Sequence, residues 1–317
     1  MSETHALPSA NCGRLTYALA KSMRPHQWIK NTLLFAALVF SQSLFDIHAV
    51  ILSVQGFLLF CLAASAVYLL NDLNDLEEDR VHPKKRHRPL AAGIISPSAV
   101  MTAMACLAVV ALTGGILISR WFCALLMIYL TMNVLYSVRL KHVVILDVMI
   151  IAVGFVLRAV AGAVAIGVDT SPWMVLCTMT LALLVGFGKR RNELCVLKEE
   201  ATSHRACLEG YSPQFLDMMM SISGGAAIVT YTLYTMANLT VQRFGSHALV
   251  LTTPFVIYGV FRYLFLIHQK TEGGDPAKLF VTDRPTLLNG CLWVLACAVC
   301  VYTPVEWLPW WIAKWSV

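Results

Sequence analysis

Charged side chains are scarce in this chain. Asp, Glu, Lys and Arg make up 13% of its 317 residues, whereas a soluble domain carries about a quarter. Hydrophobic residues make up 58%, and the mean hydropathy is +0.69. This balance excludes an ordinary soluble domain and indicates a membrane protein. Strand-like alternation over about ten residues is also lacking, so a helical bundle is expected rather than a transmembrane barrel.

Polar stretches long enough to fold separately are missing. The longest, from Lys189 to Asp217, is too short for an independent domain. We therefore expect residues 1–22 to form a polar N-terminal segment with a candidate interfacial helix, and residues 23–317 to form a single transmembrane domain. The first apolar run has no small-residue cleavage site, so no signal peptide is expected.

Signatures of disulfides and of nucleic-acid binding are lacking as well. The ten cysteines are scattered, mostly within apolar runs, where Cys behaves as a small hydrophobe. Cys297 and Cys300 form a C-x-x-C without a second pair or a nearby His, which is a weak metal or redox signal. The net charge of +6 comes mainly from basic segments between apolar runs, so it indicates topology rather than a nucleic-acid partner.

Apolar runs that approach the ~20 residues of a transmembrane helix recur along the chain. They predict about nine spans, at residues 28–45, 50–71, 98–118, 121–137, 143–166, 173–188, 218–240, 247–268 and 287–305. With the N-terminus inside, most of the 24 basic residues fall in cytoplasmic segments, as the positive-inside rule requires. The sequence thus predicts an all-α, multi-pass protein of the inner (cytoplasmic) membrane whose polar motifs face the cytoplasm.

The stretch YLLNDLNDLEEDRVHPKKRHRP, residues 68–89, places an acidic helix end directly before a basic loop. If residues 71–79 are helical, one side of the helix carries the oxygens of Asn71, Asp72, Asp75 and Asp79. Close carboxylates repel, so a positive group should compensate them. Mg²⁺ binds through one or two carboxylates and keeps places for substrate phosphates, which makes a magnesium site one interpretation. A solvated acidic helix end is the simpler interpretation.

Basic residues near the predicted cytoplasmic ends are candidate phosphate contacts. They are Lys30, Lys85, Arg88, Lys141, Lys189 and Arg190. Topology alone would account for several of these charges. Arg158 differs, because it lies well inside an apolar run, three helical turns from Asp147. It is either a functional group or part of an internal salt bridge or carbonyl cap.

Three motifs resemble those of the UbiA-type intramembrane prenyltransferase superfamily. They are N-D-x-x-D-x-x-x-D at residues 71–79, H-P-x-K-R-x-R-P-L-A-A-G at residues 82–93, and Y-S-x-x-L-K at residues 136–141 followed by Asp147. Within the superfamily, the chain is most similar to decaprenyl-phosphate phosphoribosyltransferases. The segments that carry this likeness are R-P-x-Q-W-x-K-N from Arg24, G-F-x-L-R-A-x-A-G from Gly154, K-R-x-x-E from Lys189 and F-R-Y-L from Phe261.

The resemblance implies nine transmembrane helices around a central cavity open to the cytoplasm, with residues 23–317 as the catalytic domain. It also implies a Mg²⁺-dependent transfer of the 5-phosphoribosyl group from phosphoribosyl diphosphate (PRPP) to a polyprenyl phosphate, with release of pyrophosphate, as in cell wall biogenesis. The metal ligands would be Asn71, Asp72, Asp75 and Asp79. Catalytic roles would fall to Asp75, Asp79, Asp147 and Arg158. Tyr68, Tyr136 and Arg158 would join the candidate phosphate contacts in binding the substrates.

One departure from the superfamily pattern bears on the substrates. Other members carry a second aspartate-rich motif, whereas here that region has only Asp147 among the basic Lys141 and Arg158. Fewer acids and more bases suit two phosphorylated substrates. Two alternatives stay open: a prenyltransferase that joins a polyprenyl diphosphate to an aromatic or other acceptor, and a transporter or scaffold whose charges serve topology alone.

Overall fold

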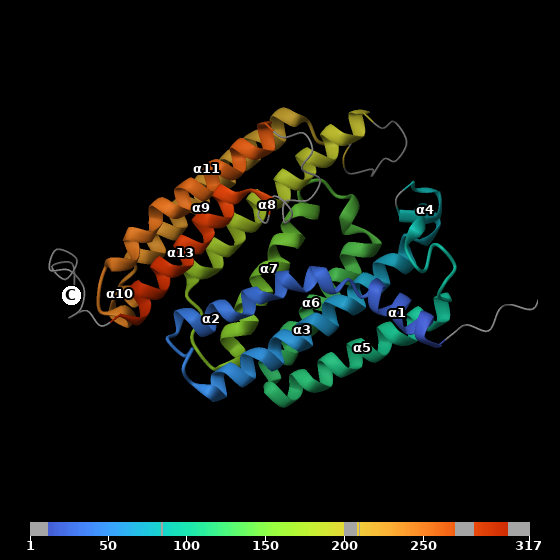
Figure 1. Cartoon of the computed structure of the whole chain (residues 1–317), viewed down its shortest axis with the longest axis horizontal. Coiled ribbons are helices and arrows are strands. Elements are labelled where there is room, and N and C mark those ends of the chain that lie inside the picture. Colours follow the sequence, from blue (N-terminus) through green and yellow to red (C-terminus); the bar gives the residue numbers. More distant parts are fainter. Residues whose placement is uncertain (1–11, 84, 200–207, 209, 270–281, 304–317) are drawn as a thin grey trace, which may run out of the picture. The chain divides into compact units, whose positions relative to one another are not determined.

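The computed structural model describes residues 12–83, 85–199, 208, 210–269 and 282–303, and all of the elements assigned in them are helical (Figure 1). This confirms the predicted all-α class. Seven helical segments are long and apolar enough to cross a membrane: Ile47–Asn74, Pro97–Ile118, Arg120–Val138, Leu146–Ala165, Pro172–Cys195, Ala248–Gln269 and Arg284–Tyr302. The chain is therefore a multi-pass membrane protein.

Two of the nine predicted spans are not among these seven segments. Residues 28–45 do not form one α-helix, because a 3₁₀ segment, η1 (Pro25–Leu34), is followed by the short α2 (Phe35–Phe40). Residues 218–240 fall largely in α9 (Pro213–Met236), whose many Ser, Thr and Gly residues keep it below the hydropathy of the seven. The total of nine spans and the central cavity stay predictions.

The chain divides into two compact units, which we describe separately. The first contains described residues within 12–32 and 55–138, and the second those within 33–54 and 139–303. Two elements, η1 and α3 (Ile47–Asn74), run from one unit into the other.

The first unit packs around the cytoplasmic end predicted for α3. It contains α1 (Cys12–Ser22), α4 (Leu76–Val81), η2 (Lys85–His87), α5 (Pro97–Ile118) and α6 (Arg120–Val138). Helices α5 and α6 pack together. Ala18 of α1, Leu69 of α3 and Val100 of α5 share one buried cluster with Leu90 and Ile95. This cluster fixes α1 and the loop after η2 beside the acidic end of α3.

The second unit is built around α8 (Pro172–Glu199), which packs against α9 and against α7 (Leu146–Ala165). Its other elements are η3 (Leu140–His142), α10 (Asn238–Phe244), η5 (Ala248–Thr252), α11 (Thr253–Gln269) and α13 (Arg284–Tyr302). The largest core cluster includes Val148, Leu184, Leu216, Met220 and Tyr263. Helix α11 packs on α9 and α13 (Figure 1).

An ion pair joins the start of α13 to α11. Asp283 caps α13 by accepting hydrogen bonds from the Thr286 backbone and hydroxyl, and it accepts two more from the guanidinium of Arg262. These bonds hold the pKa of the Asp283 carboxyl well below its usual range, with Arg262 as the main cause. The cap therefore stays charged under ordinary conditions.

Gly162 allows a close approach within the second unit. It lies on α7, and a Cβ atom there would collide with the backbone of Leu34, the fully buried residue that precedes α2. Backbone cannot move aside as a flexible side chain can, so only glycine permits this packing of α2 on α7.

We expect Gly162→Ala to lower the free energy of unfolding by about 1–3 kcal/mol or more, because the added methyl group overpacks this contact. The measurement is thermal unfolding of the purified protein in detergent. Gly225→Ala in α9 is the matched control, since its Cβ would meet no atom within 4 Å and alanine favours a helix by up to about 1 kcal/mol. Equal midpoints for the two variants would contradict the packing role of Gly162.

Candidate functional site

The acidic residues predicted as metal ligands lie where α3 gives way to α4. Helix α3 ends at Asn74, and Asp75 is the residue that caps α4, with φ −94° and ψ 10°. The backbone N–H of Asp75 still donates to Asn71, and that of Asp79 donates to Asp75, at 2.9 and 2.8 Å. The helical spacing is therefore carried through the break, so Asn71, Asp75 and Asp79 follow one another a turn apart.

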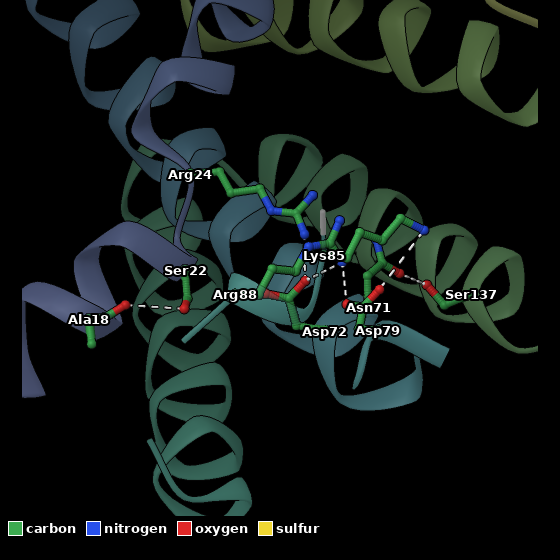
Figure 2. A network of polar contacts seen from close by, with 9 residues as sticks. All are labelled: Ala18, Ser22, Arg24, Asn71, Asp72, Asp79, Lys85, Arg88 and Ser137. Atoms are coloured by element: carbon green, nitrogen blue, oxygen red, sulfur yellow. Dashed lines mark hydrogen bonds and ion pairs between the residues drawn. The ribbon is translucent and has the colours of Figure 1, made fainter. Parts of the chain in front are cut away.

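Asp72 is the charge centre of this group. Its carboxylate is 3% exposed, and its Oδ1 atom accepts hydrogen bonds from the guanidinium groups of both Arg24 and Arg88, the latter at 3.2 Å (Figure 2). Arg88 also donates to Asp79, and the ammonium of Lys85 lies 3.9 Å from Asp79 Oδ1. The expectation that basic groups compensate the acidic helix end is confirmed.

Arg24 was absent from the residues predicted for the site. Its backbone has φ +53°, although a side chain disfavours this region and Pro25 follows it. Such a conformation costs about 1–3 kcal/mol and persists where surrounding contacts impose it. Here the guanidinium lies 5.0 Å from the ring centroid of Tyr68 as well as on Asp72. The Arg-Pro dipeptide before the first apolar run was the signal that could have found it.

Asn71 joins α3 to α6. The hydroxyl of Ser137, which is buried, donates to Asn71 Oδ1 (Figure 2). Tyr136, a predicted substrate contact, precedes Ser137 and is half-buried. The amide oxygen of Asn71 is thus oriented by a neighbouring helix, and it retains a second lone pair for another partner.

The oxygens of this group fit a magnesium ion in type. Asp79 is 1% exposed, yet its Oδ1 accepts no hydrogen bond from the described residues and has the Lys85 ammonium 3.9 Å away. Such a buried acceptor is what a hard cation uses, and Asn71 and Asp75 supply further oxygens near it in the chain. Three His, Cys, Asp or Glu side chains do not come together as a ready metal group anywhere in the described ranges. The metal assignment therefore stays a prediction.

A second charged group lies in the second unit around Asp147, which is fully buried. Its Oδ2 accepts from Arg190 Nε at 2.6 Å, and its Oδ1 accepts from the Tyr211 hydroxyl at 2.7 Å. Arg190, 2% exposed, donates onward to Glu193, whose other oxygen is 4.0 Å from the ammonium of Lys189. The chain of contacts thus runs from a sealed carboxylate to a half-exposed lysine.

Tyr211 is a second residue that the sequence prediction missed. Its hydroxyl accepts from the backbone N–H of Ile145 at 2.6 Å, and Ile145 has φ +70°, a strained value for a β-branched residue. Burial and the hydrogen bond to the Asp147 carboxylate raise the pKa of Tyr211, so the phenol stays protonated and donates. No local motif marks Tyr211, because its partners lie 64 and 66 residues away.

The remaining predicted residues are placed as follows. Lys30 lies in η1, Lys141 in η3 and Arg158 in α7. Arg158 is 7% exposed, donates to the Gly154 carbonyl oxygen at 2.6 Å, and lies 5.5 Å from the ring centroid of Phe155. Arg158 was interpreted either as a functional group or as part of an internal salt bridge or carbonyl cap. The structure shows the contact with a carbonyl oxygen. Its catalytic role stays a prediction.

We expect Tyr211→Phe to lower the free energy of unfolding by about 1–2 kcal/mol, because it leaves a buried carboxylate oxygen and a backbone N–H without a partner. The ring itself would still pack against Phe215, with centroids 6.1 Å apart. Thermal unfolding in detergent measures the effect. Tyr258→Phe is the control, since Tyr258 is 43% exposed. A midpoint unchanged from the wild type would show that the hydroxyl does not hold this network.

Comparison with known proteins agrees with the fold. The sequence profile of the UbiA prenyltransferase family matches residues 31–284. Decaprenyl-phosphate phosphoribosyltransferase of Mycolicibacterium smegmatis is 33% identical over 304 residues, which cover 91% of this chain and 93% of that protein. The protein of the same name from Mycobacterium tuberculosis is 32% identical over 291 residues, covering 90% and 94%.

The structural neighbours are UbiA homologues. One from Archaeoglobus fulgidus, solved with DMAPP and Mg²⁺, superposes with a TM-score of 0.67 over 90% of this chain and 99% of its own. Its 18% sequence identity supports the fold alone. Because the family profile covers most of the chain and full-length relatives exceed 30% identity, this chain is a multi-pass membrane protein that belongs to the UbiA prenyltransferase family.

Proposed function

We propose that this protein transfers the 5-phosphoribosyl group from PRPP to a polyprenyl phosphate and releases pyrophosphate, with magnesium as the cofactor. The observation that carries the proposal is the mixed group at the end of α3, where the cations of Arg24, Lys85 and Arg88 alternate with the oxygens of Asp72 and Asp79 (Figure 2). A metal-bridged diphosphate requires both kinds of group side by side. The names of the full-length relatives support the same substrates.

The acidic side of the group would hold the metal. Asn71, Asp75 and Asp79, together with Asp72, offer the oxygens, and Asp79 Oδ1 has no hydrogen bond to give up. When bound, magnesium supplies Lewis-acid stabilisation of the negative charge that gathers on the leaving diphosphate. This would lower the barrier to breaking the bond between ribose C1 and the diphosphate oxygen.

The basic side of the group would receive the departing pyrophosphate. A guanidinium has five N–H donors, so Arg88 can donate to a phosphate oxygen in addition to a carboxylate. Its side chain is 27% exposed and that of Lys85 is 31% exposed, so both are within reach of a ligand. Positioned cations of this kind stabilise charge as it develops without first having to reorganise.

The proposed reaction needs no general base. The electron pair of the C1–O bond leaves with pyrophosphate, and an oxygen of the lipid phosphate forms the new bond to C1 through an oxocarbenium-like state. A phosphate monoester is already anionic near neutral pH, so no proton has to be removed from it. Asp147 has both oxygens engaged and no exposed surface, so it would act by positioning Arg190 rather than by touching substrate.

We place this chemistry at the cytoplasmic face of the inner membrane, with the N-terminus inside. The support is the positive-inside distribution of the basic residues. The polyprenyl phosphate would be the membrane-borne partner and PRPP the water-soluble one.

One observation favours a second candidate, a transferase that uses polyprenyl diphosphate as donor. The Archaeoglobus homologues with the same fold were solved with the prenyl diphosphates DMAPP and GPP together with Mg²⁺. A single acidic group would also serve such a donor.

Pyrophosphate release by the purified protein distinguishes the two candidates. We expect release from PRPP only when both Mg²⁺ and a polyprenyl phosphate are present, and we expect EDTA to abolish it until Mg²⁺ is restored. Replacing PRPP by a polyprenyl diphosphate with an aromatic acceptor is the matched reaction. Turnover in that reaction alone would replace the proposed function by the second candidate.

We expect Asp75→Ala to lower turnover by about 100-fold or more while the helical content and detergent elution profile stay unchanged, because a metal ligand is lost but no core contact. The steady-state rate of pyrophosphate release is the measurement. Glu78→Ala removes an exposed acid from α4, the short helix that Asp75 precedes, and should keep full activity. Wild-type turnover in Asp75→Ala would remove this residue from the site.

A further inference from the structure

A charged cavity of about 520 Å³ lies in the first unit, beside the acidic group but largely formed by other residues. Its walls are the end of α1, the start of η1, the last turn of α3, and the end of η2 with the loop after it. The polar side chains that line it are Lys21, Ser22, Arg24, His26, Gln27, Asp72, His87 and Arg88. Its volume is within the range that holds a small ligand, about 300–1,000 Å³.

Positive charge in this cavity exceeds what the protein itself neutralises. Three permanent cations, Lys21, Arg24 and Arg88, line the cavity together with the carboxylate of Asp72. Arg24 and Arg88 donate to the same oxygen of Asp72, and Arg88 also pairs with Asp79, which the Lys85 ammonium approaches as well. Counted with Lys85, four cations are therefore set against two carboxylates. A concave site with excess charge of one sign concentrates ligands of the opposite sign.

The walls are held in place before any ligand arrives. Ser22 is buried and its hydroxyl donates to the Ala18 carbonyl at 3.1 Å (Figure 2). The backbone N–H of Gln27 donates to Arg24, and that of Arg88 donates to Lys85, both at 2.9 Å. The strained backbone of Arg24 directs its guanidinium to Asp72 at the cavity wall. Preorganised donors of this kind bind an anion at less entropic cost.

The donor set indicates the class of anion. A carboxylate has two oxygens and is satisfied by one guanidinium fork, whereas a phosphate monoester has three acceptor oxygens and up to two charges. Lys21, His26 and His87 are exposed side chains on two sides of the cavity. Together with the guanidinium groups they offer more donors than a carboxylate can accept.

Helix α1, whose end forms one wall of the cavity, also exposes apolar side chains. Ala18 packs into the buried cluster, while Leu15 and Tyr17 of the same helix are 36% and 71% exposed. Apolar side chains exposed on a helix next to transmembrane segments suit the lipid interface. At such an interface the cavity would suit a phosphate carried by a lipid as well as a water-soluble one.

We propose that Lys21, His26 and His87, with Arg24 and Arg88 behind them, form a phosphate-monoester subsite in this cavity. The inference deepens the proposed function and rests on it for the two carriers: the lipid phosphate of the acceptor or the 5-phosphate of PRPP. Bound there, the phosphate compensates the excess positive charge that lines the cavity and is held next to the diphosphate site.

The test uses Lys21→Gln, His87→Gln and the double variant of the full-length protein in lipid nanodiscs. We expect the double variant to raise KM at least tenfold for one substrate, with kcat within about twofold. A raised KM for polyprenyl phosphate identifies the lipid as the source, and a raised KM for PRPP identifies the 5-phosphate.

Lys21→Arg should restore the wild-type KM. Arg80→Gln, which removes an exposed cation paired only with Glu77 among the described residues, is the control. Both KM values equal to those of the control would overturn the subsite.

A binding measurement separates this inference from the proposed function. Ribose 5-phosphate and geranyl phosphate are titrated against each protein, and the rise in thermal midpoint is recorded, since a ligand that binds only the folded state stabilises it. We expect one of the two to stabilise the wild type and to lose this effect in the double variant. If the ligand stabilises the wild type but not the double variant, and the wild type shows no transfer activity, the subsite is supported and the proposed reaction is rejected. An active wild type whose stabilisation is the same in the double variant would reject the subsite alone.

Discussion

The pairing of Asp72 with Arg24 and Arg88 is the interaction on which the candidate site depends. A carboxylate that is 3% exposed costs several kcal/mol unless opposite charges and hydrogen bonds compensate it. Both guanidinium groups must therefore reach the end of α3, which draws the start of η1 and the loop after η2 to the same place. The acidic helix end, the basic loop and the charged cavity all follow from this one requirement.

The second unit meets the same constraint in a different way. Asp147 is sealed from solvent by Arg190 and Tyr211, and Arg190 itself is 2% exposed. In the first unit, by contrast, Arg24 and Arg88 keep about a quarter of their side-chain surface exposed. Partly exposed cations can exchange a carboxylate for a phosphate, whereas sealed ones can only fix geometry. The first group thus keeps cations that a ligand can reach, and the second group does not.

Some residues of the candidate site could be predicted from the sequence, and others could not. Asn71, Asp72, Asp79, Lys85 and Arg88 were grouped from their local spacing, and the structure brings them together, because they lie within one helix end and the next loop. Arg24 and Tyr211 were missed since they act on residues 48 and 64 positions away. The first predicted span failed as one α-helix because η1 adopts 3₁₀ geometry after the strained turn at Arg24 and Pro25.

The sequence by itself determined that this is a helical membrane protein with one acidic motif followed by a basic loop. Composition, hydropathy and spacing within a few turns are local properties, and a bilayer leaves a chain without barrel periodicity no alternative to helices. Only the tertiary structure decided that two arginines share Asp72, that Tyr211 and Arg190 enclose Asp147, and that α1 forms one wall of a charged cavity. These pairings join residues distant in sequence, and they are selected by the cost of burying a charge, which no local pattern records.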